Sequence, residues 1–223
     1  MKILALDCST EMCSAALWID GAVEQHLELA GQRHSERLLP MVSSLLAAAG
    51  IGLRGLDAVA VATGPGTFTG LRIAVSVGQG LAFGADLPVV PVGSLEALAA
   101  GAGAPWVMAC LDARMDQVYF AAYHRVEGGL EEVTAPALAA PEHLPALPAG
   151  SEWTGAGNGF DRFAPRLACA WPGLARWIPE VVPEARHVAS IAAVRMAMGR
   201  SQMPDQLLPL YVRDRVALTT AER

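Results

Sequence analysis

The sequence predicts an α/β protein in which one structural unit occurs twice. An apolar, strand-like segment ends at each of two aspartates, Asp7 and Asp112. A second strand-like segment follows each aspartate at the same interval, starting at Cys13 in the first half and at Val118 in the second, and a glycine-containing turn comes after it. Repetition of strand, acidic turn and strand at matched spacing indicates two copies of one unit.

Length and composition agree with two lobes. The chain has 223 residues, of which 53% are hydrophobic and 17% are charged, so it can build two cores and is not disordered. We expect an N-terminal lobe at residues 1–101 and a smaller C-terminal lobe at residues 102–223.

Hydropathy, the N-terminal segment and net charge argue against a membrane protein, a secreted protein and a protein that binds nucleic acid by itself. No apolar run reaches the roughly 20 residues of a membrane span, and the N-terminus is typical of a strand and not of a secretory signal, so we expect a cytoplasmic protein without a membrane partner. The net charge of -6 weighs against binding of nucleic acid by this chain alone. The four cysteines lack metal-binding spacing and are expected to be buried, reduced thiols.

The first lobe begins with a predicted β-meander and a helix. Asp20-Gly21 is a strong hairpin signal between two of its strands. The following helix shows apolar residues at i, i+3, i+4 and i+7, with Pro40 early in it. The expected strands are residues 2–6, 13–19 and 23–29, and the expected helix is residues 35–49.

The most informative stretch of the chain is a strand, a glycine loop and a helix at residues 56–83. Its loop contains Gly64, Gly66 and Gly70, and threonine hydroxyls lie beside backbone N–H groups at the start of the helix. Such a loop can bind an anion or can be a tight connection without a ligand. It is neither a P-loop nor a dinucleotide-binding loop, because the required spacing and lysine are missing.

The helix after the loop, residues 71–83, carries small residues at every fourth position. Ala74 and Gly78 belong to this stripe, which lets another backbone approach closely. That backbone can be the chain's own sheet or a helix of another subunit. A further strand at residues 88–92, a helix at 94–100 and a linker at 101–105 complete the lobe.

The second lobe is less regular. We expect strands at residues 106–112 and 118–123, a mostly irregular connection at 135–149 and another glycine loop at 153–159. No period is evident at residues 164–183. A helix at about 188–198 and an extended tail at 209–213 follow.

Duplicated meanders with an acidic turn and a glycine loop resemble the actin, hexokinase and Hsp70 ATPase architecture. Four segments are similar to the bacterial TsaB family, also called YeaZ, closely over the first 125 residues and thinly beyond. They are Ile3-Leu4-Ala5-Leu6-Asp7-Cys8-Ser9-Thr10, His34-Ser35-Glu36-Arg37-Leu38-Leu39-Pro40, Gly64-Pro65-Gly66-Thr67-Phe68-Thr69-Gly70-Leu71-Arg72 and Leu111-Asp112-Ala113-Arg114.

The resemblance implies a non-catalytic scaffold that binds the catalytic paralogue TsaD, together with the ATPase TsaE, for threonylcarbamoylation of adenosine 37 in tRNA. The catalytic relatives carry a His-x-x-x-His metal pair where this chain has Ser94 and Leu98, so neither catalytic nor metal residues are expected here. Binding of tRNA is expected only through the complex.

The resemblance also implies nucleotide and partner sites. No cofactor is required, but ATP or ADP at the lobe junction or a subunit interface would contact Asp7, Thr10, Gly64 and Gly66. The alternative is that Asp7 and Asp112 only bond their own turns. Arg114 can bind an anion or form an exposed ion pair, and His34 with Glu36 is expected to cap a helix.

Two helices are expected to pack against TsaD, or against a second copy in a homodimer. Apolar faces of this kind also serve as core. The alternative functions are an independent ATP-dependent kinase or carbamoyltransferase and a peptidase. The expected interface residues are Leu38, Leu39, Val42, Leu45, Leu46, Arg72, Ala74 and Gly78.

Overall fold

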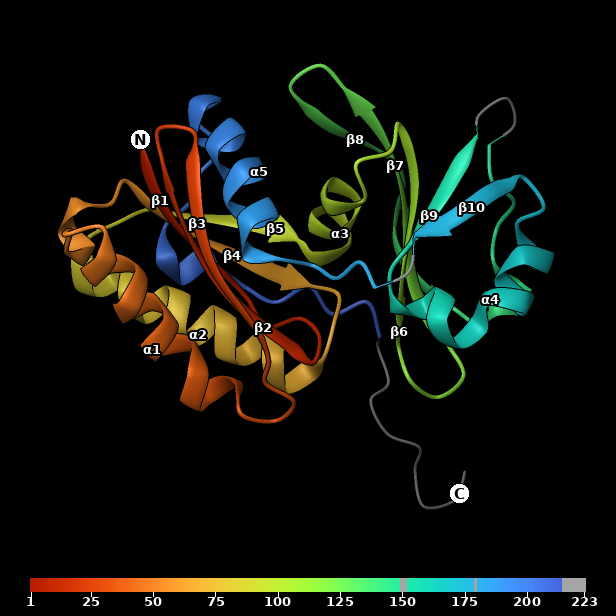
Figure 1. Ribbon diagram of the computed structural model, residues 1–223, viewed down its shortest axis with the longest axis horizontal. Coiled ribbons are helices and arrows are strands. Elements are labelled where there is room, and N and C mark those ends of the chain that lie inside the picture. Colours follow the sequence, from red (N-terminus) through yellow and green to blue (C-terminus); the bar gives the residue numbers. More distant parts are fainter. Residues whose placement is uncertain (149–151, 179, 214–223) are drawn as a thin grey trace.

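Two lobes, each built on a five-stranded sheet, lie side by side in the computed structural model, which describes residues 1–148, 152–178 and 180–213 (Figure 1). The strand orders are β3-β2-β1-β4-β5 and β10-β9-β6-β7-β8. Reversed, the second order repeats the first, with β6 in the place of β1 and β10 in the place of β5. The expected duplicated α/β fold is confirmed.

The first sheet is antiparallel on one side of β1 and parallel on the other. β1 pairs antiparallel with β2 and parallel with β4. Asp20 and Gly21 both have positive φ between β2 and β3, as the two-residue hairpin requires. The strands are β1 (Lys2–Asp7), β2 (Met12–Ile19), β3 (Ala22–Leu29), β4 (Ala58–Gly64) and β5 (Val89–Gly93).

Helices cover both faces of this sheet. α1 (His34–Ala48) and α2 (Phe68–Ala85) lie on one face, and α5 (Ala185–Ala197) lies on the other (Figure 1). The short helix α3 (Ser94–Ala102) connects the first sheet to the second. A 3-10 turn, η1 (Leu53–Gly55), precedes β4.

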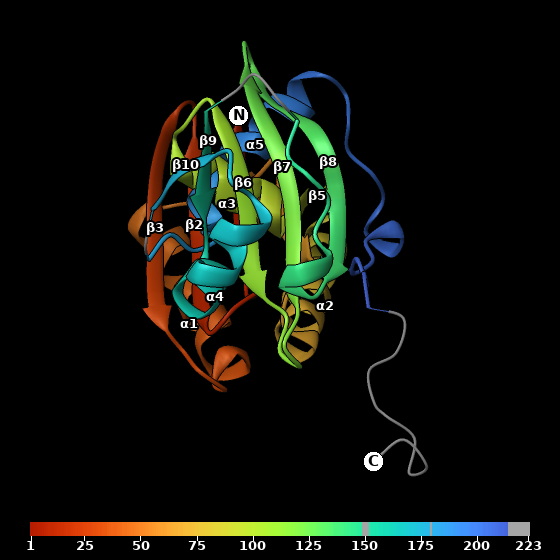
Figure 2. The same cartoon turned by 90° about the vertical axis from the view of Figure 1, so that its right-hand side faces the viewer.

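The second sheet repeats this connectivity with shorter helices, and Figure 2 shows it facing the viewer. α4 (Asn158–Ala170) follows β9 as α2 follows β4, whereas the 3-10 turn η2 (Pro141–His143) stands where α1 would be. The strands are β6 (Trp106–Asp112), β7 (Val118–Val126), β8 (Gly129–Ala139), β9 (Trp153–Ala156) and β10 (Leu174–Ile178).

The small-residue stripe of α2 faces the chain's own sheet. Gly70, Ala74, Gly78 and Ala82 are all buried. A Cβ atom at Gly78 would lie 2.5 Å from Val61 Cγ2 on β4. The close approach anticipated for this stripe is therefore internal, and the alternative of a helix from another subunit is wrong for these positions.

Three segments of the second half differ from expectation. Residues 135–139 continue β8 instead of belonging to an irregular connection, and residues 174–178, which showed no period, form β10. α5 starts three residues earlier than predicted and returns to the first sheet, where its alanines pack against β1, β4 and β5. The lobe boundary after residue 101 stays a prediction. However, α5, which covers one face of the first sheet, comes from the range expected to form the second lobe.

Three of the four cysteines are buried free thiols, as expected, and the fourth is exposed. Cys8, Cys13 and Cys110 are buried free thiols, and Cys169 on α4 is an exposed one. Within the ranges that the structure describes, no helix has the length and apolar character needed to cross a bilayer.

Two glycines on α2 provide a matched test of this packing. Gly78→Ala should lower the free energy of unfolding by about 1–3 kcal/mol, because the new methyl group would overlap Val61, whose χ1 is restricted. Gly80→Ala should raise it by about 0.5–1 kcal/mol, since nothing lies within 4 Å of a Cβ atom there and helix propensity improves. Urea unfolding of both variants measures the difference, and equal effects would contradict an internal stripe.

Candidate functional site

The first component of the site is the turn between β1 and β2. Asp7 ends β1, and its Oδ1 accepts hydrogen bonds from the backbone N–H and the hydroxyl of Ser9, both at 2.7 Å. Its Oδ2 is buried without a partner among the described residues. Burial raises the pKa of Asp7 to about 6, although the bonds from Ser9 oppose the shift. Asp7 therefore binds its own turn.

His34 anchors α1 to the same turn. Its Nε2 lies 3.0 Å from Thr10 O and 3.2 Å from Met12 O. Because both neighbours are carbonyl oxygens, Nε2 carries the proton and donates to them. The start of α1 has no side-chain cap hydrogen bond, so the expected capping role of His34 and Glu36 is wrong.

The second component is the glycine loop between β4 and α2, which lies directly on the β1–β2 turn. Thr67 N donates to Ser9 O at 2.8 Å. A Cβ atom on Gly66 would collide with Ser9 O, and one on Gly70 would collide with Cys8 O. Glycine is required at both positions because the two backbones are in contact there. This packing explains the two glycines without a bound ligand.

The third component comes from the second lobe. Asp112 Oδ1 accepts from Arg114 N at 2.8 Å, and Asp112 Oδ2 lies 3.0 Å from Arg162 Nη1 and 3.5 Å from Arg114 Nη1. Arg114 Nη2 also reaches across to Glu11 Oε1 of the first lobe at 2.9 Å. The expected ion pair of Arg114 is present, and Asp112 is held by two guanidinium groups.

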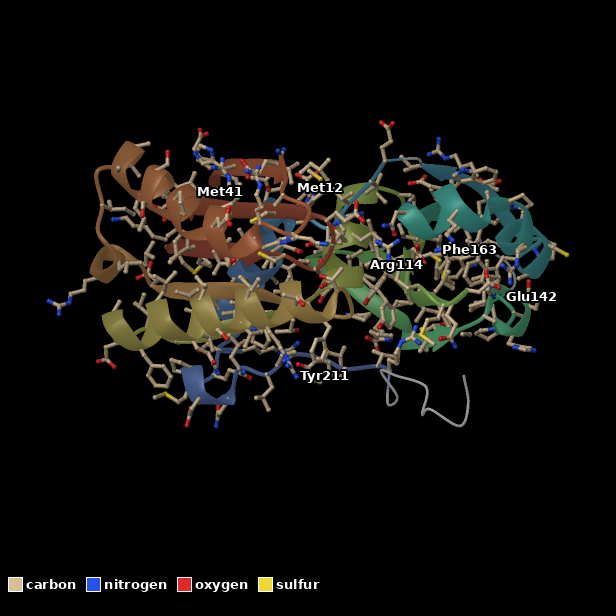
Figure 3. The ribbon with its side chains drawn as sticks, turned by 90° about the horizontal axis from the view of Figure 1, so that it is seen from below. Met12, Met41, Arg114, Glu142, Phe163 and Tyr211 are labelled. Atoms are coloured by element: carbon tan, nitrogen blue, oxygen red, sulfur yellow. The ribbon has the colours of Figure 1, made fainter. Side chains whose placement is uncertain are left out.

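The tail forms the fourth component. Leu210 N donates to Thr63 O at 2.8 Å, and Arg72 Nε donates to Tyr211 OH at 2.8 Å, which ties the tail to β4 and α2. Arg213 Nη2 then donates to Ala113 O in the second lobe at 2.9 Å. Figure 3 shows Arg114 between the lobes and Tyr211 on the C-terminal segment beside α2. Residues 207–213, which we call the strap, thus bridge the lobes.

These four components surround a cavity of about 710 Å³ between the lobes, which we call the cleft. Of the four residues expected to contact a nucleotide, Thr10 and Gly66 line the cleft, whereas Asp7 and Gly64 do not. Gly64 instead lies against the strap, where a Cβ atom would be 2.9 Å from Leu210 O. The cleft is also lined by charged, polar and aromatic side chains, among them Glu11, Phe68, Arg72, Asp112, Arg114, Tyr119, Asn158, Tyr211 and Arg213.

Sequence reasoning missed the aromatic and cationic wall of the cleft. Phe68 and Tyr211 have ring centroids 5.7 Å apart, and the Arg72 guanidinium lies 3.7 Å from the Phe68 centroid. The alternating apolar and cationic residues of the tail were only a weak sequence signal for this wall, because residue 211 comes close to residue 68 only in the folded chain. Asn158, which accepts from Asp112 N at 2.9 Å, was not anticipated either.

A metal–nucleotide complex of the kind bound by ATPases of this architecture does not fit the cleft. Such a complex needs carboxylates that face its phosphates and metal. Asp7 does not line the cleft, and Asp112 is paired with Arg114 and Arg162. Among the residues described, no group of three or more His, Cys, Asp or Glu side chains is placed to hold a metal ion.

The segment at the start of α3 is part of the core. Ser94 and Leu98 are both fully buried, and Ser94 Oγ has no hydrogen-bond partner within the described part of the chain. Neither side chain reaches the cleft lining.

The expected partner-interface residues need correction. Arg72 and Leu39 are exposed, with Leu39 at 46%. The other six pack between the helices and the first sheet and are unavailable to a partner, because the apolar spacing that predicted them marks the inward faces of both helices. They are Leu38, Val42, Leu45, Leu46, Ala74 and Gly78.

Comparisons with known proteins match the chain to a TsaD profile over part of its length and to TsaB and YeaZ proteins over nearly all of it. The sequence profile of TsaD, described as tRNA N6-adenosine threonylcarbamoyltransferase, matches residues 26–169. The chain is 38% identical to the tRNA threonylcarbamoyladenosine biosynthesis protein TsaB of Escherichia coli strain K12, over 97% of this chain and 96% of that protein. A solved structure of YeaZ from Pseudomonas aeruginosa is 39% identical, with a TM-score of 0.89 over 94% of this chain and 99% of that one.

The buried carboxyl of Asp7 predicts a pH dependence of stability. Its pKa is about 6 in the folded chain against an ordinary value of 3.8, so its contribution is fully present below 3.8 and is lost as pH rises through about 6. Asp7→Asn abolishes this pH-dependent loss of stability, because an asparagine side chain does not ionise. The difference in free energy of unfolding between the variant and the unmodified chain should therefore change by about 2–3 kcal/mol in favour of the variant as the pH rises from about 4 to about 7. A difference that does not change with pH in urea titrations would rule out a raised pKa.

Proposed function

Because the chain belongs to the TsaB family, also called YeaZ, we propose that it acts in biosynthesis of threonylcarbamoyladenosine in tRNA as a scaffold for its catalytic paralogue TsaD. In this proposal the chain has no catalytic residues of its own. It presents α1 and α2 to TsaD, and TsaE joins the resulting complex.

The observation that carries this proposal is the outward face of α2. The 18 residues of this helix include one charged side chain, Arg72, although the helix lies on the protein surface. A surface helix ordinarily turns charged residues to water. The exposed positions are instead Thr69, Arg72, Ser76, Gly80, Phe83 and Gly84, and Ile73 and Val77 are half-buried beside them.

α1 extends this apolar and small surface. Leu39, Ser43 and Ala47 are exposed at intervals of four along α1. Phe83 on α2 is 60% exposed, and no atom lies within 4 Å of a Cβ position at Gly80 or Gly84. An exposed face of this kind is typical of a protein–protein interface. The docking face therefore consists of the outward residues of α1 and α2, and not of the inward residues expected from sequence.

A TsaD-type protein is the occupant that the homology supports. The TsaD profile spans residues 26–169, so the part of the chain shared with TsaD includes both α1 and α2. Two similar helix pairs can pack about a pseudo-twofold axis, each meeting the same surface of the other. The same geometry supports a homodimer of this chain when TsaD is absent.

The remaining features agree with a non-catalytic role in a larger complex. Ser94 and Leu98 supply no metal ligands where the catalytic relatives have histidines. The net charge of -6 favours contact with tRNA through partner subunits. The role needs no cofactor in this chain, and ATP or ADP at the lobe junction or a subunit interface would be compatible with it.

An independent ATP-dependent kinase or carbamoyltransferase is the alternative function, with a peptidase as a further one. Reconstitution separates them from the scaffold. Purified chain, TsaD, TsaE, the threonylcarbamoyl donor enzyme, ATP and tRNA are mixed, and modified adenosine is measured with each component omitted. Modification that depends on the chain, with no turnover by the chain alone, supports the scaffold, whereas ATP turnover by the chain alone would overturn it.

A charge on the docking face should separate the subunits. Gly80→Arg places a guanidinium at the middle of the apolar face, where burial without a partner is costly. Size-exclusion chromatography with TsaD should show loss of the complex, with binding weakened at least tenfold, while urea unfolding of the isolated chain stays cooperative.

Ala197→Arg is the matched control, because Ala197 is an exposed residue at the end of α5, on the opposite face of the first sheet. It should leave the complex intact. Retained binding by Gly80→Arg, or equal loss in both variants, would exclude the α1–α2 face as the docking site.

A further inference from the structure

Two of the buried thiols, Cys8 and Cys13, lie next to each other. Their Sγ atoms are 3.8 Å apart. In the antiparallel pairing of β1 with β2, Asp7 faces Ser14, so residues 8 and 13 are the next two positions that face each other. Side chains at such positions lie on the same face of the sheet, and their Cα atoms are typically about 4.5–5.5 Å apart. A disulfide bond joins Cα atoms about 4.4–6.8 Å apart, so this arrangement is suited to one.

The two thiols differ in acidity. The hydrogen bond between them lowers the pKa of Cys13, although burial opposes this effect, and the guanidinium of Arg37 also favours the Cys13 thiolate. The same hydrogen bond raises the pKa of Cys8, and burial raises it further. The thiolate is the nucleophilic form of cysteine. Cys13 is therefore the thiol that attacks an oxidant, and Cys8 is the second thiol that completes a disulfide.

Cys13 lies beneath an ion pair at the surface. It faces Glu28 in the pairing of β2 with β3, and Glu28 is paired with Arg37 of α1. Both charged side chains are partly exposed, and ion pairs of this kind contribute little to stability. Opening of the pair admits a reagent of about the size of water, whereas a bulky disulfide would need a larger rearrangement of the buried site. The geometry therefore favours a small oxidant.

A bond between the two cysteines would close a ring at residues 8–13, and the main chain of this ring holds the starts of two helices. Thr67 N, one residue before α2, donates to Ser9 O at 2.8 Å. His34 Nε2, in the first residue of α1, lies 3.0 Å from Thr10 O. A displacement of the ring would therefore be felt at both helices.

We propose that Cys8 and Cys13 form a modification site that a small hydroperoxide oxidises to a reversible intramolecular disulfide. The Cys13 thiolate sulfur attacks one peroxide oxygen and the O–O bond breaks. The hydroxide that leaves takes up the proton lost by the Cys13 thiol, which gives Cys13 sulfenic acid and, from hydrogen peroxide, water.

The second step joins the two sulfurs. The Cys8 sulfur attacks the Cys13 sulfur, the S–O bond breaks, and the hydroxide leaves as water with the proton of Cys8. The hydroperoxide thus accepts the two electrons that the thiols lose. Exchange with an external dithiol returns both cysteines to thiols. This inference concerns the isolated chain and does not depend on the scaffold role.

Oxidation of the folded chain tests the site. The starting protein is Cys169→Ser, because Cys169 is exposed and would link chains to one another. After treatment with hydrogen peroxide the protein is unfolded, its free thiols are alkylated with N-ethylmaleimide, and intact mass gives their number. We expect loss of two of the three remaining thiols, a peptide cross-linked between Cys8 and Cys13, and full recovery of thiols with dithiothreitol.

Cys110 is the internal control, because it is an equally buried thiol on β6 and burial raises its pKa. It should be oxidised about tenfold more slowly than the pair, or slower still. Cys13→Ala in the same background should leave Cys8 reduced, since Cys8 is buried and loses the thiol that reacts first. Unfolding temperatures verify that this variant is folded, and the cross-linked peptide of the starting protein is informative without it.

Hydrogen exchange measures whether closing the ring affects the helices. The sulfur atoms must approach from 3.8 Å to about 2 Å, and the packed core limits how much of this side-chain rotation can supply. The main chain of the ring is therefore displaced. The amide of Thr67 should exchange about threefold faster, or more, in the oxidised chain. Val89 N, which donates to Gln202 O at 2.9 Å outside the ring, should be unchanged.

Several results would overturn the modification site. They are retention of both thiols, a cross-link that forms only after unfolding, oxidation of Cys110 at the same rate as the pair, and sulfinic acid at Cys13 in place of the disulfide. Equal exchange at Thr67 in the two states, or slower exchange after oxidation, would overturn the effect on the helices. None of these results depends on TsaD, so failure here is distinct from failure of the scaffold role.

Discussion

The contact between the glycine loop and the β1–β2 turn is the constraint on which the rest of the first lobe depends. Gly66 and Gly70 lie against the carbonyl oxygens of Ser9 and Cys8, at separations that no side chain would permit. This contact sets the direction in which α2 leaves the sheet, and it places Thr10 and Gly66 on the cleft. The second lobe has a related but not equivalent contact, since a Cβ atom on Gly157 would collide with Cys110 O inside β6, two residues before Asp112. In both lobes a glycine after the fourth or equivalent strand thus lies directly against the main chain of the central strand or its turn.

α2 has two faces that a four-residue period cannot tell apart from sequence. Gly78 and Gly80 are two residues apart, yet one packs on Val61 and the other has no neighbour within 4 Å. Small residues on the inward face let α2 approach the sheet closely. Small and apolar residues on the outward face of α2 leave Arg72 as its one charged side chain, and this low charge is the basis of the proposed interface. Most of the interface residues predicted from sequence lie on the inward side of each helix, because apolar spacing identifies the face that is buried in the monomer.

Local signals predicted the strands and hairpin of the first lobe closely, because alternation, turn residues and the glycine loop act over short distances. The same reasoning predicted a helix near α5 and an extended tail but not what either packs against, and it missed β10. Each depends on contacts with distant residues, such as Leu210 with Thr63 and Arg213 with Ala113. The cleft was anticipated at the lobe junction, but its arginine and aromatic wall comes from residues near positions 70, 114 and 211, which only the folded chain brings together. Of the two alternatives that the sequence left for Asp7, a contact with phosphate and a bond to its own turn, the structure has the second, because Oδ1 accepts hydrogen bonds from Ser9.

The position of α5 has a consequence for how the protein is made. Ile3, Ala5 and Ala60 form part of an apolar sheet face that is covered by α5, a helix that follows both sheets in the sequence. A ribosome releases that helix only after both sheets have emerged. Until then the first lobe exposes one apolar face, a state that invites association with other chains. The first lobe of the nascent chain is thus incomplete until α5, which follows both sheets in the sequence, has emerged.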